Sequence, residues 1–155
     1  MDVRYINPFI EQALNVLKMM AQTEAFHGTP SVKTDNSTWG VVTGLIGLAG
    51  DNVTGNLIIS FDEPCILAIV NRMLMETYTE INDQIVDAVG EMTNMIAGGA
   101  KSKLAEEGFS INMATPAMLV GKSIKIAQLT TTPILTIPFE TNEGKFVIEA
   151  SLARR

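Results

Sequence analysis

Residues 82–108 carry the longest helical pattern in the chain, and this pattern constrains the fold more than any other feature. Asn82 and Asp83 are typical of a helix start, and Gly108 is typical of a helix stop. At about 100° per residue, the apolar side chains between them fall on one stripe. The stripe consists of Ile85, Val89, Met92, Ile96, Ala100 and Leu104. It predicts a long helix that ends near Glu107 and packs this face against a core.

A second stripe lies on the opposite face of this predicted helix, and we call it the outer stripe. Steps of three and four residues join its members, which are Asp87, Glu91, Asn94, Gly98, Lys101 and Ala105. Glu91 and Asn94 are three residues apart, so their side chains are neighbours on the outer face. Asn94 has mediocre helix propensity and no cap to make in mid-helix.

Three glycines surround the Glu91/Asn94 pair. In a helix interior, each of Gly90, Gly98 and Gly99 costs about 1 kcal/mol relative to alanine. A low surface around a projecting acid and amide favours close approach by a partner. The alternative is that the pair is an ordinary exposed pair and that the glycines are packing contacts, with Gly99 near the edge of the core.

Two further helices are expected. Asn7-Pro8 is typical of an N-cap followed by proline at the first helical position, which predicts a helix that ends near Ala21. Asp62 marks another helix start, and it predicts a short apolar helix over residues 64–77. No linker or low-complexity tract interrupts the chain, so we expect one domain over residues 1–155.

The remaining segments predict strands, and the fold class is therefore α+β. Strands are expected at residues 31–34, 39–49, 54–61, 113–120, 124–129, 134–139 and 145–150. Asp51-Asn52 and residues 141–144 are turns that form two hairpins. We expect a mostly antiparallel sheet packed against long helices.

A weak duplication is visible in the two hairpins. Residues 54–59 (Thr-Gly-Asn-Leu-Ile-Ile) resemble residues 143–148 (Glu-Gly-Lys-Phe-Val-Ile), and each segment is the second arm of a hairpin. The order helix, hairpin, helix, hairpin indicates duplicated helix–hairpin units. The alternative is that hairpins resemble one another because their turns need glycine.

Composition excludes several classes of protein. The net charge of −6 and the pI of about 4.7 give no basic face for nucleic acid. One cysteine allows no intramolecular disulfide, and one histidine allows no two-histidine zinc site. The first eight residues lack the apolar core of a signal peptide, and no uncharged apolar run reaches the roughly 18 residues that span a bilayer. We expect a cytoplasmic protein without a membrane or nucleic-acid partner.

Other candidate residues favour ordinary structural roles. Cys65 follows Pro64 near a helix start, but its apolar neighbours predict a small buried residue rather than a reactive thiolate. His27 is expected in a loop, and Trp39 is expected to pack at a strand start. Residues 44–50 are rich in glycine but lack the Gly-Lys-Ser/Thr ending of a phosphate loop, so no nucleotide site is expected.

Residues 90–104 (Gly-Glu-Met-Thr-Asn-Met-Ile-Ala-Gly-Gly-Ala-Lys-Ser-Lys-Leu) resemble the signature helix of the CheC/CheX/FliY phosphatase group. That signature is Glu-x-x-Asn, then small residues, then Lys-x-x-Leu. The order of elements is similar as well, including Val120-Gly121-Lys122 between late strands. The resemblance extends from about Ile6 to Leu152. It implies a CheC-like fold and a single CheX-like phosphatase domain.

The first helix offers only part of a second motif. It reads Glu11-Gln12-Ala13-Leu14, with Leu14 where the motif would need asparagine. Asn15 is one residue late and points about 100° away. This pattern favours one active helix, the CheX arrangement, in which the family forms homodimers through its β-sheet.

The resemblance implies a phosphatase for the aspartyl-phosphate of a phosphorylated CheY-like response regulator in chemotaxis signalling. Asn94 is expected to orient the attacking water, because a carboxamide both donates to and accepts from water. Glu91 is expected to pair with the regulator's active-site lysine. The residues expected to contact the partner are Asp87, Gly90, Met95, Gly98 and Lys101.

The same resemblance implies no metal and no cofactor in this chain, with Mg²⁺ expected in the regulator's own site. Two alternatives share the fold, because fold does not determine function. One is a non-catalytic module that binds a response regulator. The other is a dimerisation domain in which the Glu91/Asn94 helix is buried against its twin.

Overall fold

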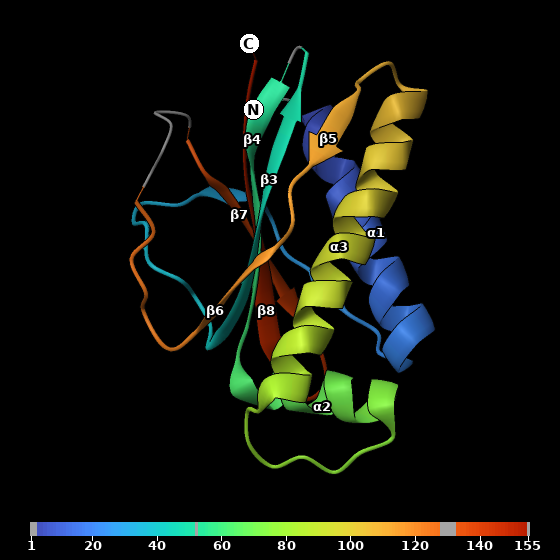
Figure 1. Ribbon diagram of the computed structural model, residues 1–155, viewed down its shortest axis with the longest axis vertical. Helices are drawn as coiled ribbons and strands as arrows, with labels where there is room; N and C mark the ends of the chain where they lie inside the picture. The colour runs from blue at the N-terminus through green and yellow to red at the C-terminus, as the bar shows by residue number, and fades with distance from the viewer. Residues whose placement is uncertain (1–2, 52, 128–132, 155) are drawn as a thin grey trace.

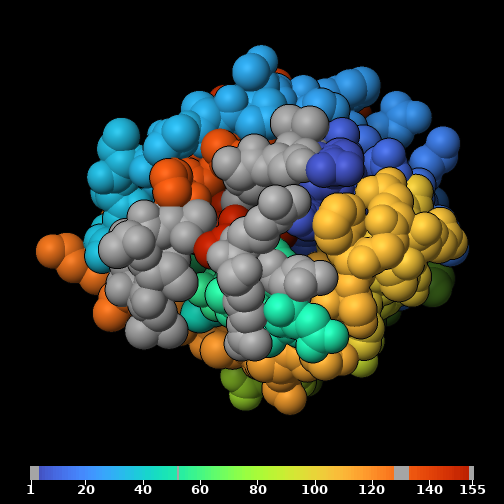
Figure 2. Space-filling model, turned by 90° about the horizontal axis from the view of Figure 1, so that it is seen from above, coloured from blue at the N-terminus to red at the C-terminus, as the bar shows by residue number. Residues whose placement is uncertain are grey.

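A computed structural model describes residues 3–51, 53–127 and 133–154 of the chain. They form two layers, with a sheet on one side and helices α1 (Val3–Ala21) and α3 (Asp83–Glu106) side by side on the other (Figure 1). Helix α2 (Glu63–Leu74) lies across one end of this pair. At the opposite end, the start of α1 and the end of α3 are again neighbours (Figure 2), and the rings of Tyr5 and Phe109 meet there at 4.8 Å. Within the described ranges, no helix has both the length and the apolar content needed to cross a membrane.

The caps of α2 and α3 follow the sequence prediction. The Asp62 carboxylate accepts a hydrogen bond from the Cys65 N–H at 2.9 Å, and the Asn82 side chain accepts one from the Ile85 N–H at 3.0 Å. Gly108, just beyond α3, has a φ of +88°. Helix α2 ends earlier than residue 77, because Met75 adopts the left-handed conformation and its N–H bonds to the Asn71 carbonyl.

Helix α1 begins earlier than predicted, so Asn7 is not its N-cap. The helix starts at Val3 and contains Pro8. Pro8 cannot donate a backbone hydrogen bond to Arg4, which costs about 3 kcal/mol. The side chains of Tyr5 and Ile6 are buried, and burial of such side chains contributes about 1.5–3 kcal/mol each. Burial of this first turn therefore offsets the proline.

The sheet contains eight strands within the described residues. They are β1 (Phe26–His27), β2 (Ser31–Val32), β3 (Val42–Gly50), β4 (Val53–Phe61), β5 (Ile111–Met113), β6 (Ala117–Val120), β7 (Leu135–Glu140) and β8 (Lys145–Arg154). The order is β1-β7-β8-β4-β3-β5, with β2 also on β7 and β6 also on β3. Every pairing is antiparallel. The β3–β4 and β7–β8 hairpins confirm the two that the sequence predicts.

Three strand predictions need correction. The strand expected at residues 113–120 is two strands, β5 and β6, separated at residues 114–116, where Pro116 cannot donate to a ladder. Trp39 precedes β3 and is 44% exposed, so its expected packing role is wrong. In residues 124–127, the described part of the strand expected at residues 124–129, an isolated bridge between Lys125 and Ser37 replaces the strand. Residues 128 and 129, like Asn52 in the first turn, lie outside the described residues.

The sheet consists of two halves with the same arrangement of strands, which confirms the predicted duplication of helix–hairpin units. Strands β4 and β8 pair at the centre, with β3 outside β4 and β7 outside β8. The short strands β1 and β2 follow α1 in the chain but pair with β7. The short strands β5 and β6 follow α3 but pair with β3. Each half therefore supplies edge strands to the other half.

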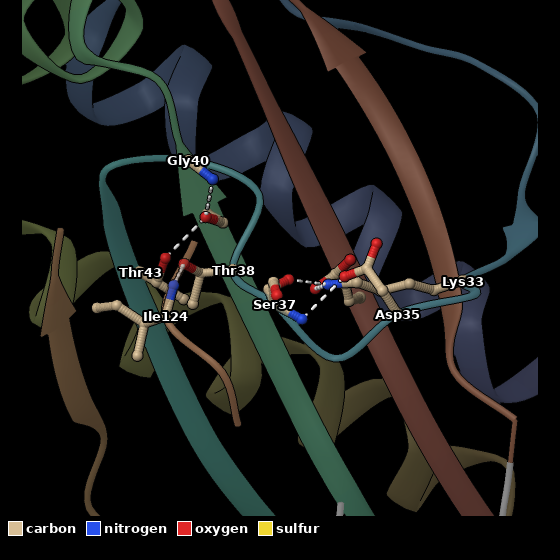
Figure 3. A network of polar contacts seen from close by, with 9 residues as sticks. Lys33, Asp35, Ser37, Thr38, Gly40, Thr43 and Ile124 are labelled. Atoms are coloured by element: carbon tan, nitrogen blue, oxygen red, sulfur yellow. Dashed lines mark hydrogen bonds and ion pairs between the residues drawn. The ribbon is translucent and has the colours of Figure 1, made fainter. Parts of the chain in front are cut away.

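The loop before β3 is anchored on the sheet face away from the helices (Figure 3). Lys33 Nζ donates to the Ser37 carbonyl at 2.6 Å and to the Glu149 carboxylate at 2.9 Å. The side chain of Glu149 is 2% exposed and that of Lys33 is 11% exposed. Burial raises the pKa of the Glu149 carboxyl, and the hydrogen bond from Lys33 acts in the opposite direction.

Candidate functional site

The apolar stripe of α3 forms its core face, as predicted. All six of its residues are buried against the sheet and α1: Ile85, Val89, Met92, Ile96, Ala100 and Leu104. Thr93 is buried as well, and its hydroxyl donates to the Val89 carbonyl at 2.8 Å. This burial fixes the rotation of α3 about its axis, so the outer stripe is turned toward solvent.

Glu91 and Asn94 are both exposed on the outer face of α3. Neither side chain has a hydrogen bond or ion pair with the described part of the chain. A carboxylate and a carboxamide one helical turn apart therefore point outward without partners. Nothing in the subunit, within the described ranges, obstructs their approach to another molecule.

Four of the five residues expected to contact the partner flank this pair. Asp87 and Lys101 are exposed, Met95 is 39% exposed, and Gly98 is half-buried. Gly90 differs from them, because a Cβ built on it would lie 3.5 Å from the Met118 sulfur of β6. Gly90 therefore faces the edge of the sheet rather than the centre of the outer stripe.

The other two glycines of α3 have separate roles. A Cβ on Gly99 would lie 2.3 Å from Oε1 of Gln12, so Gly99 lets α1 approach closely and is a packing glycine. Apart from the adjacent backbone of α3 itself, a Cβ on Gly98 would meet no atom of the described chain within 4 Å. Gly99 therefore confirms the packing interpretation, whereas Gly98 faces open space within the described chain.

Some residues that hold α3 in place could not be predicted from the sequence. A Cβ on Gly44 of β3 would lie 2.3 Å from the Thr93 hydroxyl, so this glycine lets α3 lie close to the sheet. Lys103 forms an ion pair with Glu11 of α1, and the hydrogen bond to Glu11 raises the Lys103 pKa. These partners are far apart along the chain, so no local pattern indicates them.

The described residues contain no cluster of three or more His, Cys, Asp or Glu side chains suited to a metal ion. Burial raises the pKa of Cys65 to about 12, so its thiol stays protonated at neutral pH. His27 lies in β1 rather than in a loop, and its ring is exposed. Neither residue is near the Glu91/Asn94 pair in sequence or on the same element.

This arrangement, two long helices on a duplicated antiparallel sheet with an acid and an amide exposed on one helix, has known relatives. A CheC-like superfamily protein from Shewanella sp. PV-4 shares 42% sequence identity and a TM-score of 0.92, with 99% of each chain covered. The fold is thus that of the CheC-like superfamily. The family model described as chemotaxis phosphatase CheX matches residues 42–140, a range that includes all of α3. The chain belongs to the CheX family of chemotaxis phosphatases.

Two further relatives carry functional descriptions. A protein of Thermotoga maritima named CheY-P phosphatase CheX is 29% identical over 128 residues, which cover 81% of each chain. The crystal structure of a CheX–CheY–BeF₃–Mg²⁺ complex from Borrelia burgdorferi matches with 31% identity and a TM-score of 0.78, covering 97% of each chain.

Proposed function

We propose that this chain removes the phosphoryl group from the aspartyl-phosphate of a CheY-like response regulator. The observation that carries the proposal is the exposed, unpartnered Glu91/Asn94 pair on the helix of a CheX-family domain. The names of the relatives support it, because the Thermotoga maritima protein is called a CheY-P phosphatase and the Borrelia burgdorferi CheX forms a complex with CheY.

Asn94 acts on the attacking water. A phosphorylated regulator already holds an acyl phosphate beside a metal ion and a lysine, so charge stabilisation is present there. Hydrolysis also needs a water in line with the phosphorus. The Asn94 carboxamide donates one hydrogen bond and accepts another, which orients that water. It carries no negative charge that would repel the phosphoryl group. A glutamine has the corresponding role in GTPases.

Glu91 fixes the position of the complex. Its carboxylate, one turn from Asn94, pairs with the regulator's active-site lysine through a charge-assisted hydrogen bond. Asp87, Met95, Gly98 and Lys101 surround this contact, and Gly90 lies at its sheet side. The chain itself supplies no metal and no cofactor, and Mg²⁺ belongs to the regulator.

The expected setting is part of the same proposal. The chain acts as one domain over residues 1–155, in the cytoplasm where response regulators are found, and as a homodimer formed through the sheet. In such a dimer the exposed side of each α3 stays free, because α3 lies in the helical layer and the contact is made by the other layer, the sheet (Figure 1).

The test is a direct measurement of phosphoryl loss. CheY-type regulators of the source organism are phosphorylated with acetyl phosphate, freed of the donor, and followed with and without a small amount of this protein. Faster loss of phosphate from at least one regulator is the expected result. Tight binding of a phosphorylated regulator without faster loss would instead identify a non-catalytic binding module.

A further inference from the structure

Gly98 is an interior residue of α3 for which folding alone favours a different amino acid. Apart from the adjacent backbone of α3 itself, a Cβ added there would have no atom of the described chain within 4 Å, whereas one added to Gly99 would lie 2.3 Å from Oε1 of Gln12. Glycine destabilises a helix interior relative to alanine. The described part of the chain therefore gives no packing reason for glycine at position 98.

The position of Gly98 on α3 suits a contact with another protein. Gly98 lies one helical turn after Asn94 on the same face. It presents bare backbone directly beside a carboxamide that has no partner among the described residues. Glycine is the residue that allows another main chain or a ligand to approach a backbone closely. Met95 and Lys101, three residues before and after Gly98, carry long exposed side chains, whereas Gly98 carries none.

We propose that Gly98 is a positioning residue for the dephosphorylation reaction. Its bare backbone admits the rim of the regulator's phosphorylated pocket against α3, and this contact sets how deeply Asn94 enters the pocket. A methyl group at position 98 would hold the two proteins apart and move the Asn94 amide away from the water. This inference rests on the proposed phosphatase function, and displacements of about 1 Å at a reacting centre are sufficient to slow catalysis about 100-fold.

The test compares stability with activity in Gly98→Ala. The substitution improves helix propensity, so we expect the melting temperature to rise by about 2–4 °C. We expect the rate of phosphoryl loss from a CheY-type regulator phosphorylated with acetyl phosphate to fall at least about tenfold. Gly98→Leu is expected to retain the higher melting temperature and to lose more activity. Ala105→Leu is the matched control, because it adds bulk on the same exposed face about two turns farther from Asn94.

The outcomes separate this inference from the function on which it rests. Higher stability combined with lower activity in Gly98→Ala supports the inference, because a purely structural glycine would lower both. If the wild type is active and Gly98→Ala is equally active, the role of Gly98 is wrong and the proposed function stands. A fall in melting temperature in Gly98→Ala would also overturn it, because the glycine would then serve the fold. If the wild type accelerates phosphoryl loss from no regulator, both are overturned.

Discussion

Ile59 of β4 lies directly opposite Ile148 of β8 at the centre of the sheet. The same two residues occupy equivalent positions in the two similar hairpin segments, residues 54–59 and 143–148. The two halves are therefore related by an approximate twofold axis that passes through this pair. The axis makes α1 and α3 counterparts. Only α3 carries the acid and the amide three residues apart, because the residue three positions after Glu11 in α1 is Leu14, which packs against the core.

Asn94→Ala is expected to reduce the rate of phosphoryl loss about 100-fold, because the water loses its orienting partner. Asn94 is exposed and has no hydrogen bond in the described chain, so stability should change by less than about 0.5 kcal/mol. Stopped-flow or radiolabel assays measure the rate. Ser102→Ala, an exposed position on the same helix, is the control. An unchanged rate in Asn94→Ala would show that the amide has no part in the chemistry.

Glu91→Gln is expected to weaken binding more than it slows the chemical step. Loss of a charge-assisted contact to the regulator's lysine should raise the dissociation constant about tenfold and reduce its salt dependence. Titration of a phosphorylated regulator at two ionic strengths measures both effects. Glu106→Gln, another exposed acid of α3, should leave the affinity unchanged. Equal affinities for the wild type and Glu91→Gln would contradict the proposed ion pair.

Gly44→Ala is expected to lower the free energy of unfolding by about 1–3 kcal/mol, because its new methyl group would overlap the buried Thr93 side chain. Gly47→Ala in the same strand is the matched control, since its nearest neighbouring atom would be 3.8 Å away. Its effect should stay within about 0.5 kcal/mol. Urea unfolding measures both variants, and equal stabilities would show that α3 is not held by this close approach.

The buried carboxyl of Glu149 should make stability depend on pH. Burial raises its pKa, so the folded chain keeps this proton to a higher pH than the unfolded chain does. The contribution of this group is therefore fully present below the ordinary carboxyl pKa and is lost as the pH rises through the raised value. Urea unfolding of the wild type and Glu149→Gln over a pH series tests this. The wild type should lose stability relative to the variant as the pH rises. A relative gain would contradict it.

Cys65 should resist modification in the folded protein, because burial raises its pKa to about 12 and little thiolate exists at neutral pH. A thiol-specific reagent in native buffer should label almost no protein, whereas the unfolded chain should react with one equivalent. Rapid labelling under native conditions, at a rate unaffected by stabilising salts, would mean that the thiol is accessible in the fold.

Local signals in the sequence predicted the helices that matter for the site. The caps at Asn82 and Asp62 and the apolar stripe of α3 depend on neighbours within a few residues, and the structure confirms them. The predicted start of α1 at Pro8 was wrong. The residues next to a proline do not show whether it stands at the first position of a helix or inside the helix. Burial of the preceding turn, which is a tertiary effect, decides between the two.

The rest of the site depended on contacts that sequence spacing does not encode. Gly98 and Gly99 are adjacent and identical, yet one faces open space and the other faces Gln12 of α1. The pairings of Gly44 with Thr93 and of Lys33 with Glu149 join segments that are far apart in the chain. The outward direction of the Glu91/Asn94 pair could be predicted, because it follows from which stripe is apolar.

The exchange of edge strands between the two halves makes each half incomplete without its counterpart. If either half were expressed alone, its hairpin would present unpaired main-chain groups where the borrowed strands belong. Such a fragment would tend to associate with a second fragment rather than remain a monomer. The sheet that supports α3 is therefore complete only when both halves of the chain have folded together.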